Sequence, residues 1–204
     1  MDNLWQLAMH HTPDLALAGA LAWGAGIRLY AVTFIFGIAS YLGYWQLPEH
    51  LTLIAHPAML AASGFMSTVE LFADKLPWLD SIWDSLQTFI RIPAGAALAG
   101  AVFGDSGPAI AMAAALIGGS LTATTHFAKS GTRAVANTSP EPFSNLALSL
   151  TEDVAVVGGS YLAAQYPGTF IVCLLVFIVL AIILIRLIYK GFGRVFGRIK
   201  ETFA

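Results

Sequence analysis

The chain is short of charge for its length. Charged residues make up 11% of its 204 residues and hydrophobic residues 57%, whereas a soluble domain carries about 25% charged residues. So little charge cannot cover a surface that faces water, and the mean hydropathy of +0.74 indicates the same. The composition therefore excludes a soluble enzyme and predicts an integral membrane protein whose main partner is the lipid bilayer.

Further absences narrow the classes of function. The net charge of −2 provides no field that would attract nucleic acid. The only cysteine, Cys173, excludes an intrachain disulfide. Residues 1–12 contain no Lys or Arg, so we expect no cleavable signal peptide there. The His, Cys and acidic residues do not show the spacing of zinc ligands, and we expect neither a metal nor another cofactor.

Apolar runs are what the sequence has in quantity. A membrane-spanning helix needs about 20 residues, so a chain of this length has room for roughly six. The longer runs cover residues 29–45, 51–73, 108–127, 143–161 and 169–185. Two more runs, 15–25 and 94–103, are short, and the first of them either spans or enters and returns. We predict an all-α, polytopic transmembrane helix bundle of about six membrane segments, with two short or broken helices.

Residues 78–92 have a different pattern, with apolar and polar residues on opposite faces of a helix. The apolar positions are Leu79, Ile82, Trp83, Leu86, Phe89 and Ile90, and the polar positions are Asp80, Asp84, Gln87 and Arg91. This pattern is typical of a helix that lies on the membrane surface. We therefore divide the single transmembrane domain, 1–204, into a first half (1–77), this interfacial linker helix (78–92), a second half (93–166) and a C-terminal span with a basic tail (167–204).

The basic residues predict an orientation. Basic residues near the ends of spans stay in the cytoplasm, and the last apolar run is followed by Arg186, Lys190, Arg194, Arg198 and Lys200. Counting back from this end puts Arg28, Lys75, Arg91, Lys129 and Arg133 on the same side. We expect a bacterial inner-membrane protein with a cytoplasmic C-terminus, whose last ~15 residues form a basic interfacial tail.

Two short motifs suggest an internal repeat. Gly26-Ile-Arg28 and Gly131-Thr-Arg133 each precede a proline and an apolar helix with an acidic residue, Glu70 in one half and Glu152 in the other. Repeats with short or broken helices are typical of transporters. Since both motifs fall on one side of the expected topology, a parallel repeat is favoured, and an inverted one stays open.

Acidic residues inside apolar runs are the first candidates for a functional site. Glu152 and Asp153 lie near the middle of 143–161, and Glu70 lies one helical turn before Asp74. A charged side chain at the bilayer centre costs about 2.5–3.5 kcal/mol on insertion scales, so it usually faces the bundle interior or a wet cavity. These acids would line an ion pathway, or alternatively bind basic partners that lock the bundle.

Basic and polar residues could complete this site. Arg28 and Arg133 could pair with these acids, bind an anion near a helix N-terminus, or only anchor the protein at the membrane surface. His126, one turn before Lys129, could relay protons or be a hydrogen-bonded interface residue. The candidate pathway residues are Arg28, Glu70, Asp74, His126, Lys129, Arg133, Asn145, Ser149, Glu152 and Asp153.

Asn145 and Ser149 belong to this set because they form a polar stripe with Glu152. Spacings of four and three residues place the three side chains on one helix face. A polar stripe on an apolar helix faces protein or water more often than lipid. It would suit a solute path, and it would equally suit hydrogen bonds between helices.

Several of these segments together match the motifs of a known family. They are Glu70-Leu-Phe-Ala-Asp-Lys-Leu-Pro77 with Asp80 and Asp84, Arg91-Ile-Pro-Ala-Gly95, His126-Phe-Ala-Lys129 leading through Gly131-Thr-Arg133 to Asn137-Thr-Ser-Pro-Glu-Pro142, Ser149 with Glu152-Asp153, and Gly26-Ile-Arg28. Over roughly residues 15 to 165 the chain resembles the DUF4126 family of bacterial membrane proteins. The function of that family is uncharacterised, so the resemblance implies a shared set of polar residues and no particular activity.

Two functions fit these observations. The first is a transporter or channel for a small solute or ion, with a buried polar site in which the carboxylates couple transport to a proton or cation. The alternative is a non-transporting scaffold or complex subunit whose buried ion pairs are structural. A homo-oligomer stays open in both cases. An enzyme acting within the membrane would need a nucleophile motif or a metal set that the sequence lacks, so we expect no enzyme.

Overall fold

The computed structural model describes residues 2–74, 77–138 and 142–202, and the side chains of 11–74, 79, 82–138 and 143–191. The helices are α1 (Asp2–Tyr41), α2 (Pro57–Ala73), α3 (Pro77–Val102), α4 (Pro108–Ala136), α5 (Pro142–Gln165) and α6 (Pro167–Thr202), with short 3₁₀ helices η1 (Glu49–Ala55) and η2 (Gly104–Ser106). The described part of the chain contains no strand, which confirms the all-α expectation.

Proline marks where most of these helices begin, because it is the first residue of each helix from α2 to α6. The fixed φ of proline suits the first helical position, where the missing N–H would have no partner in the helix. Ahead of α2, the Nδ1 atom of His56 accepts a hydrogen bond from the amide of Ala58. Ahead of α4, Gly107 has a φ of +95°, a conformation that glycine adopts without strain.

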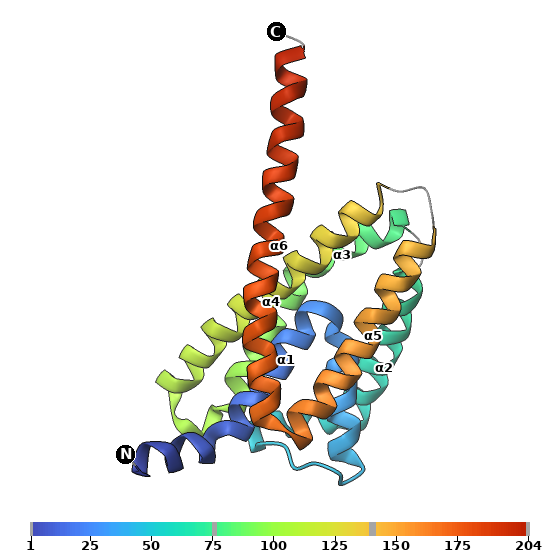
Figure 1. Cartoon of the computed structure of the whole chain (residues 1–204). Helices are drawn as coiled ribbons and strands as arrows, with labels where there is room; N and C mark the ends of the chain where they lie inside the picture. Colours follow the sequence, from blue (N-terminus) through green and yellow to red (C-terminus); the bar gives the residue numbers. More distant parts are fainter. Residues whose placement is uncertain (1, 75–76, 139–141, 203–204) are drawn as a thin grey trace.

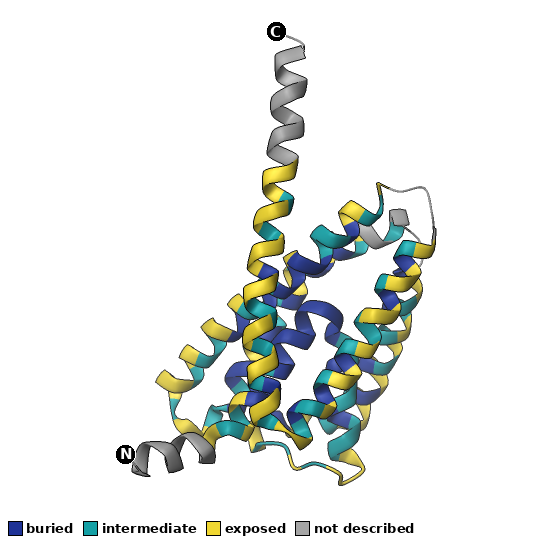
Figure 2. Cartoon of the chain, viewed as in Figure 1, coloured by how far each residue is buried: buried dark blue, intermediate teal, exposed yellow. Residues whose placement is uncertain are grey.

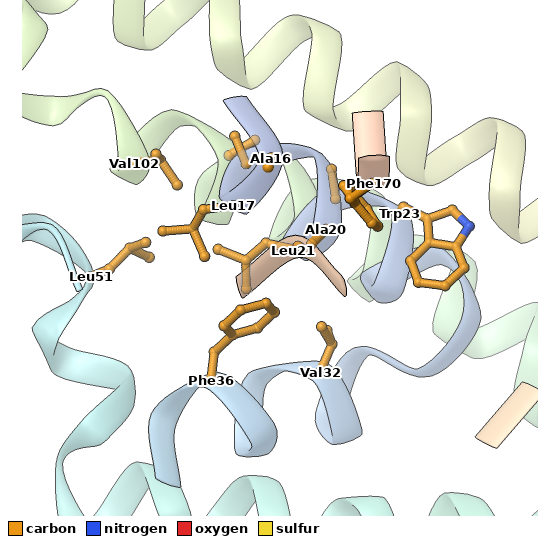
Figure 3. Packing of buried hydrophobic residues seen from close by; sticks show 14 of the residues in the cluster. Ala16, Leu17, Ala20, Leu21, Trp23, Val32, Phe36, Leu51, Val102 and Phe170 are labelled. Atoms are coloured by element: carbon orange, nitrogen blue, oxygen red, sulfur yellow. The ribbon is translucent and has the colours of Figure 1, made fainter. Parts of the chain in front are cut away.

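The longest helix, α1, folds back on itself at Arg28, whose backbone is not helical (φ −147°, ψ 82°). A Cβ atom built on Gly24 would lie 2.6 Å from Cγ2 of Val32, although eight residues of straight helix span about 12 Å. The part of the first arm that carries Leu17 and Leu21 faces the second arm, which carries Val32 and Phe36 (Figure 3, with the whole chain in Figure 1). The apolar runs 15–25 and 29–45 therefore form a helical hairpin with Arg28 at its tip.

The α1 hairpin lies at the centre of the bundle. Leu21, Val32 and Phe36 pack between its arms, and Phe170 from α6 packs against the first arm (Figure 3). Burial is concentrated on α1, whereas the described part of α6 is mostly exposed (Figure 2). In numbers, 72% of the apolar window of α1 is buried and only 6% of that of α6. The hairpin is thus covered by protein, and α6 presents an apolar surface outwards.

Helix α3 corrects the expectation of a break at Pro93. Residues 78–92 and the short segment 94–103, which are expected to be separate, belong to one helix that passes through Pro93. A proline removes one backbone donor and need not end a helix whose neighbours satisfy the freed groups. The linker helix and the first segment of the second half are therefore continuous.

The face of α3 that is buried is also the opposite of the expected one. Asp84, Gln87 and Arg91 are buried in the bundle, whereas Leu86 and Phe89 are 61% and 82% exposed. A helix lying on the membrane surface would turn this polar face to water. Polar side chains inside and apolar ones outside are instead what a lipid environment requires. The side chain of Asp80 lies outside the described residues.

Length and composition allow four of the described helices to cross a membrane: His11–Tyr41, Pro108–Ala136, Phe143–Gln165 and Pro167–Gly191. A fifth is reached if η1 and α2, which bend by 62° at their junction, form one span. These helices fit an integral membrane protein, but this count does not confirm the expected six segments. The expected basic tail continues α6 as far as Thr202, and the side chains of Lys75, Arg194, Arg198 and Lys200 lie outside the described residues.

Candidate functional site

Charged side chains from all five of the helices α1 to α5 meet at the tip of the α1 hairpin. They are Arg28, Glu70, Asp74, Asp84, Arg91, Lys129, Arg133, Glu152 and Asp153. Most of these side chains are 0–6% exposed, and the most accessible, Asp153, is 34% exposed. A connected network of ions is therefore buried inside an apolar bundle.

Arg28 joins the hairpin tip to two other helices. Its Nη1 atom lies 2.7 Å from Oδ2 of Asp74, just after α2, and its Nε atom lies 2.6 Å from Oδ1 of Asp153 on α5. Its Nη2 atom also donates a hydrogen bond of 2.8 Å to the hydroxyl of Ser149. One guanidinium thus fixes the position of the tip relative to α2 and α5.

The break in α1 exposes backbone carbonyls that other cations use. The carbonyl oxygen of Ile27 accepts a hydrogen bond of 2.9 Å from Nζ of Lys129, and that of Gly26 accepts a longer one of 3.5 Å from Nη1 of Arg91. A helix end leaves its last carbonyls without partners in the helix and favours cations nearby. The non-helical residue Arg28 therefore explains why three cations gather at one point.

Arg133 and Lys129, both on α4, complete the pairing with α5. Arg133 holds Glu152 through two parallel hydrogen bonds, Nε to Oε1 at 2.9 Å and Nη2 to Oε2 at 2.8 Å. This two-point geometry is the strongest form of such a pair. The Nη2 atom of Arg133 also lies 3.3 Å from Oδ2 of Asp74, and Nζ of Lys129 lies 3.3 Å from Oε2 of Glu152. We call Arg28, Lys129, Arg133, Asp74, Glu152 and Asp153 the balanced cluster, because it contains three cations and three carboxylates.

The remaining three charges form a second group around Arg91, which we call the Arg91 cluster. Nη2 of Arg91 pairs closely with Oε1 of Glu70, and its Nη1 lies 3.4 Å from Oδ1 of Asp84. Nη1 also donates to Nδ1 of His126 at 3.3 Å. Two carboxylates therefore share one guanidinium here, and Lys129, 3.9 Å from Asp84, links this cluster to the balanced one.

Cavities reach the network from different sides. A cavity of about 320 Å³ between α3 and α4, the α3–α4 cavity, is lined by Asp84, Thr88, His126 and Arg133. Another of about 290 Å³, the α1–α5 cavity, is lined by Arg28 and Asp153 together with residues of α2. A third, of about 280 Å³, is lined by Lys129 and Glu152. Among the described residues, three cavities therefore border the network.

The structure brings together nine of the ten residues predicted from the sequence. Arg133 pairs with Glu152, which agrees with the expectation that the arginines could pair with the acids. Arg28 pairs with Asp74 and Asp153, and Glu70 pairs instead with Arg91. The tenth residue, Asn145, is buried beside the network, where it donates to Oδ1 of Asn137 at 2.7 Å.

Asp84 and Arg91 are the site residues that the sequence analysis missed. Their spacing of seven residues places both on one face of a helix. The prediction of a helix on the membrane surface assigns that face to water. The signal was present, but the pattern alone does not say whether a polar face meets solvent or other charged side chains. Only the partners on α2 and α4 decide this.

The burial of the basic residues also changes the argument for orientation. Arg28, Arg91, Lys129 and Arg133 are 0–7% exposed and paired with acids, so they are not loop charges in the sense of the positive-inside rule. Surface anchoring by Arg28 and Arg133, one of the open alternatives, is wrong for the same reason. The predicted orientation then depends on the basic residues at the C-terminal end.

A search among curated proteins and a search among solved structures each gave no match. A family model described as a domain of unknown function, DUF4126, matches residues 15–187. The match extends beyond the resemblance seen in the sequence, which ends near residue 165, into α6, and it includes all nine charged residues of the network. The chain therefore belongs to the DUF4126 family.

Proposed function

We propose that this protein is a membrane transporter or channel for a small polar solute or ion, and that the buried ion-pair network is its central site. The observation that carries the proposal is the presence, among the described residues, of nine charged side chains inside an apolar bundle, bordered by cavities. Ionisable groups are expensive within a membrane and most often mark ion or substrate pathways there.

The hairpin tip supports this proposal. Broken helices in transporters place backbone carbonyls and helix ends near the middle of the membrane, where they contact ions and substrates. Here the carbonyls of Gly26 and Ile27 point at cations of the network. A solute that enters from the α3–α4 cavity would compete for these groups and loosen the ion pairs that separate it from the α1–α5 cavity.

The placement in the membrane is part of the proposal. Since α1 returns at Arg28, we take its hairpin as re-entrant and α2 to α6 as the crossing helices. The first and last helices then start and finish at opposite ends of the bundle (Figure 1). The basic residues after the last span favour a cytoplasmic C-terminus, in the inner membrane of a bacterium. The internal repeat and a homo-oligomer stay predictions.

The alternative, a scaffold whose ion pairs are structural, is favoured by one observation. The two-point pair between Arg133 and Glu152 is almost fully buried, and such pairs fix helices relative to one another. In this case neutralising a pair would lower stability, and no flux would be lost because none exists.

Electrical measurements on proteoliposomes separate these two functions. Concentration jumps of sodium, potassium, ammonium, zwitterionic amino acids and short carboxylates serve as probes. We expect a transport current with at least one probe in the wild type, and its loss in Glu152→Gln and Glu70→Gln. Asp105→Asn is the matched control, because Asp105 is an exposed carboxylate that pairs with exposed His50. The absence of current with every probe, or unchanged currents in both site variants, would contradict the proposal.

A further inference from the structure

The two clusters of the network differ in charge. In the balanced cluster, three carboxylates face three cations. In the Arg91 cluster, the carboxylates of Glu70 and Asp84 share the guanidinium of Arg91, while Lys129, the other cation near Asp84, already faces two acids of the balanced cluster. Among the described residues the network thus holds five carboxylates and four cations. An uncompensated charge in a buried site is so costly that the group normally becomes neutral instead. The Arg91 cluster therefore calls for one additional positive charge, and a proton is the smallest way to supply it.

His126 adjoins this cluster but does not carry that proton. The guanidinium of Arg91 can only donate, so Nδ1 of His126 must accept from it. The Nε2 atom lies 2.7 Å from the hydroxyl of Thr88, whose single hydrogen is donated to the carbonyl of Asp84 at 2.9 Å. Nε2 therefore carries the hydrogen between them. These partners assign the neutral form of the imidazole.

Of the two carboxylates, Asp84 has the better surroundings for a negative charge. Its Oδ1 atom lies 3.4 Å from Arg91 and 3.9 Å from Lys129, and it lines the α3–α4 cavity. Glu70 is completely buried, and among the described residues Arg91 is the one cation within ion-pair distance of it. Unpartnered oxygens do not separate the two acids, because Oε2 of Glu70 and Oδ1 of Asp84 both lack a hydrogen-bond partner among the described residues. With one paired cation and complete burial, Glu70 is a poorer place for a negative charge than Asp84, which faces two cations and lines the cavity.

We propose that Glu70 holds a proton and that the Arg91 cluster is a proton-binding site. Among the described residues, the charged groups around Glu70 are Arg91 on α3, Asp74 after its own helix, Lys129 on α4 and Arg28 at the hairpin tip, and Asp84 contacts the same guanidinium of Arg91. The α3–α4 cavity leads to Asp84 and His126, which both contact Arg91. A role of this proton as the coupling ion of transport rests on the proposed function. The protonated state of Glu70 is independent of that function.

Infrared spectroscopy of the purified full-length protein in lipid nanodiscs tests this assignment. A protonated carboxyl has a C=O stretch that an ionised one lacks. We expect this band in the wild type at neutral pH, a shift of the band when glutamate carboxyls are labelled with ¹³C, and its loss in Glu70→Gln. The label needs no variant, so the test survives if Glu70→Gln fails to fold.

Two further variants sharpen the result. In Asp84→Asn, Arg91 faces Glu70 as its one carboxylate, so Glu70 ionises and the band disappears. In the control Asp105→Asn, the band stays. No band in the wild type, a band that does not respond to labelled glutamate, or a band that persists in Asp84→Asn would overturn the proposal. The spectra require no transported solute, so failure here leaves the flux test intact, and absence of flux leaves the protonated Glu70 intact.

Discussion

The balanced cluster and the Arg91 cluster show how one buried network serves two purposes. In the first, α1, α4 and α5 are tied by three cations and three acids, including the two-point pair of Arg133 and Glu152. In the second, one guanidinium serves two acids beside an open cavity. The first arrangement fixes helices in place, whereas the second can gain or lose a charge. In this proposal, equal numbers of cations and acids hold the helices together as a lock, and the excess acid of the Arg91 cluster is where a proton binds.

The hairpin tip joins the two clusters. Three successive residues touch both, since the carbonyl of Gly26 faces Arg91, that of Ile27 faces Lys129, and the side chain of Arg28 reaches Asp74. A change at the tip should therefore affect the lock and the binding site together.

The largest effect is expected from Arg28→Ala, which breaks the lock. It removes the closest cation of both Asp74 and Asp153, and removing one partner of a buried pair costs about 3–5 kcal/mol. We expect this loss in thermal or denaturant unfolding in detergent. Arg186→Ala, at an exposed position of α6, is the control and should change stability by less than about 0.5 kcal/mol. Equal losses in the two variants would contradict the role of Arg28.

The next effect is expected from Gly26→Ala, which displaces the tip without changing any charge. A Cβ atom at Gly26 would lie 2.6 Å from Cβ of Thr125 and 2.7 Å from the carbonyl oxygen of Thr122, so the hairpin must move away from α4. Overpacking of this kind costs about 1–3 kcal/mol. Gly158→Ala is the control, because no atom lies within 4 Å of its added Cβ. Equal unfolding free energies of Gly26→Ala and Gly158→Ala in the same assay would contradict the close packing of Gly26 against α4.

A smaller effect isolates the central pair of the lock. Arg133→Gln, Glu152→Gln and the double variant form a thermodynamic cycle, and residues in one ion-pair network couple by about 0.5–3 kcal/mol. We expect a coupling energy in this range. It is the change in unfolding free energy of the double variant minus the sum of the changes of the two single variants. A parallel cycle with Arg133→Gln and Asp105→Asn should show none. Additive losses in the first cycle would mean that the two-point pair contributes little.

Much of this arrangement could be predicted from the sequence. Acids inside apolar runs, such as Glu152 and Asp153, can only be tolerated with polar partners, and that rule located most of the network. The hairpin could not be predicted, because a break near Gly26 and Arg28 does not reveal whether the chain continues or returns. The approach of Gly24 to Val32 shows that the chain returns, and the close packing of Gly26 against α4, about 100 positions away in the sequence, holds the tip.

The polar face of α3 shows a second limit of sequence reasoning. Periodicity assigns Asp84 and Arg91 to one face, but a water-facing helix and a helix with its polar face inside give the same pattern. The difference lies in Glu70 and His126, which come from other helices and cover that face. Tertiary contacts therefore determined the one part of the site that was assigned to solvent.

Asp74 and Glu70 provide the most direct test, because they lie one turn apart at the end of α2 and belong to different clusters. If Glu70 is protonated, Glu70→Gln replaces one neutral group with another, and the unfolding free energy should change by less than about 1.5 kcal/mol. Asp74→Asn removes a charge that three cations face and should cost about 3–5 kcal/mol. Unfolding of both variants in the same lipid or detergent gives the comparison. Equal, large losses would show that Glu70 is ionised and would contradict the account.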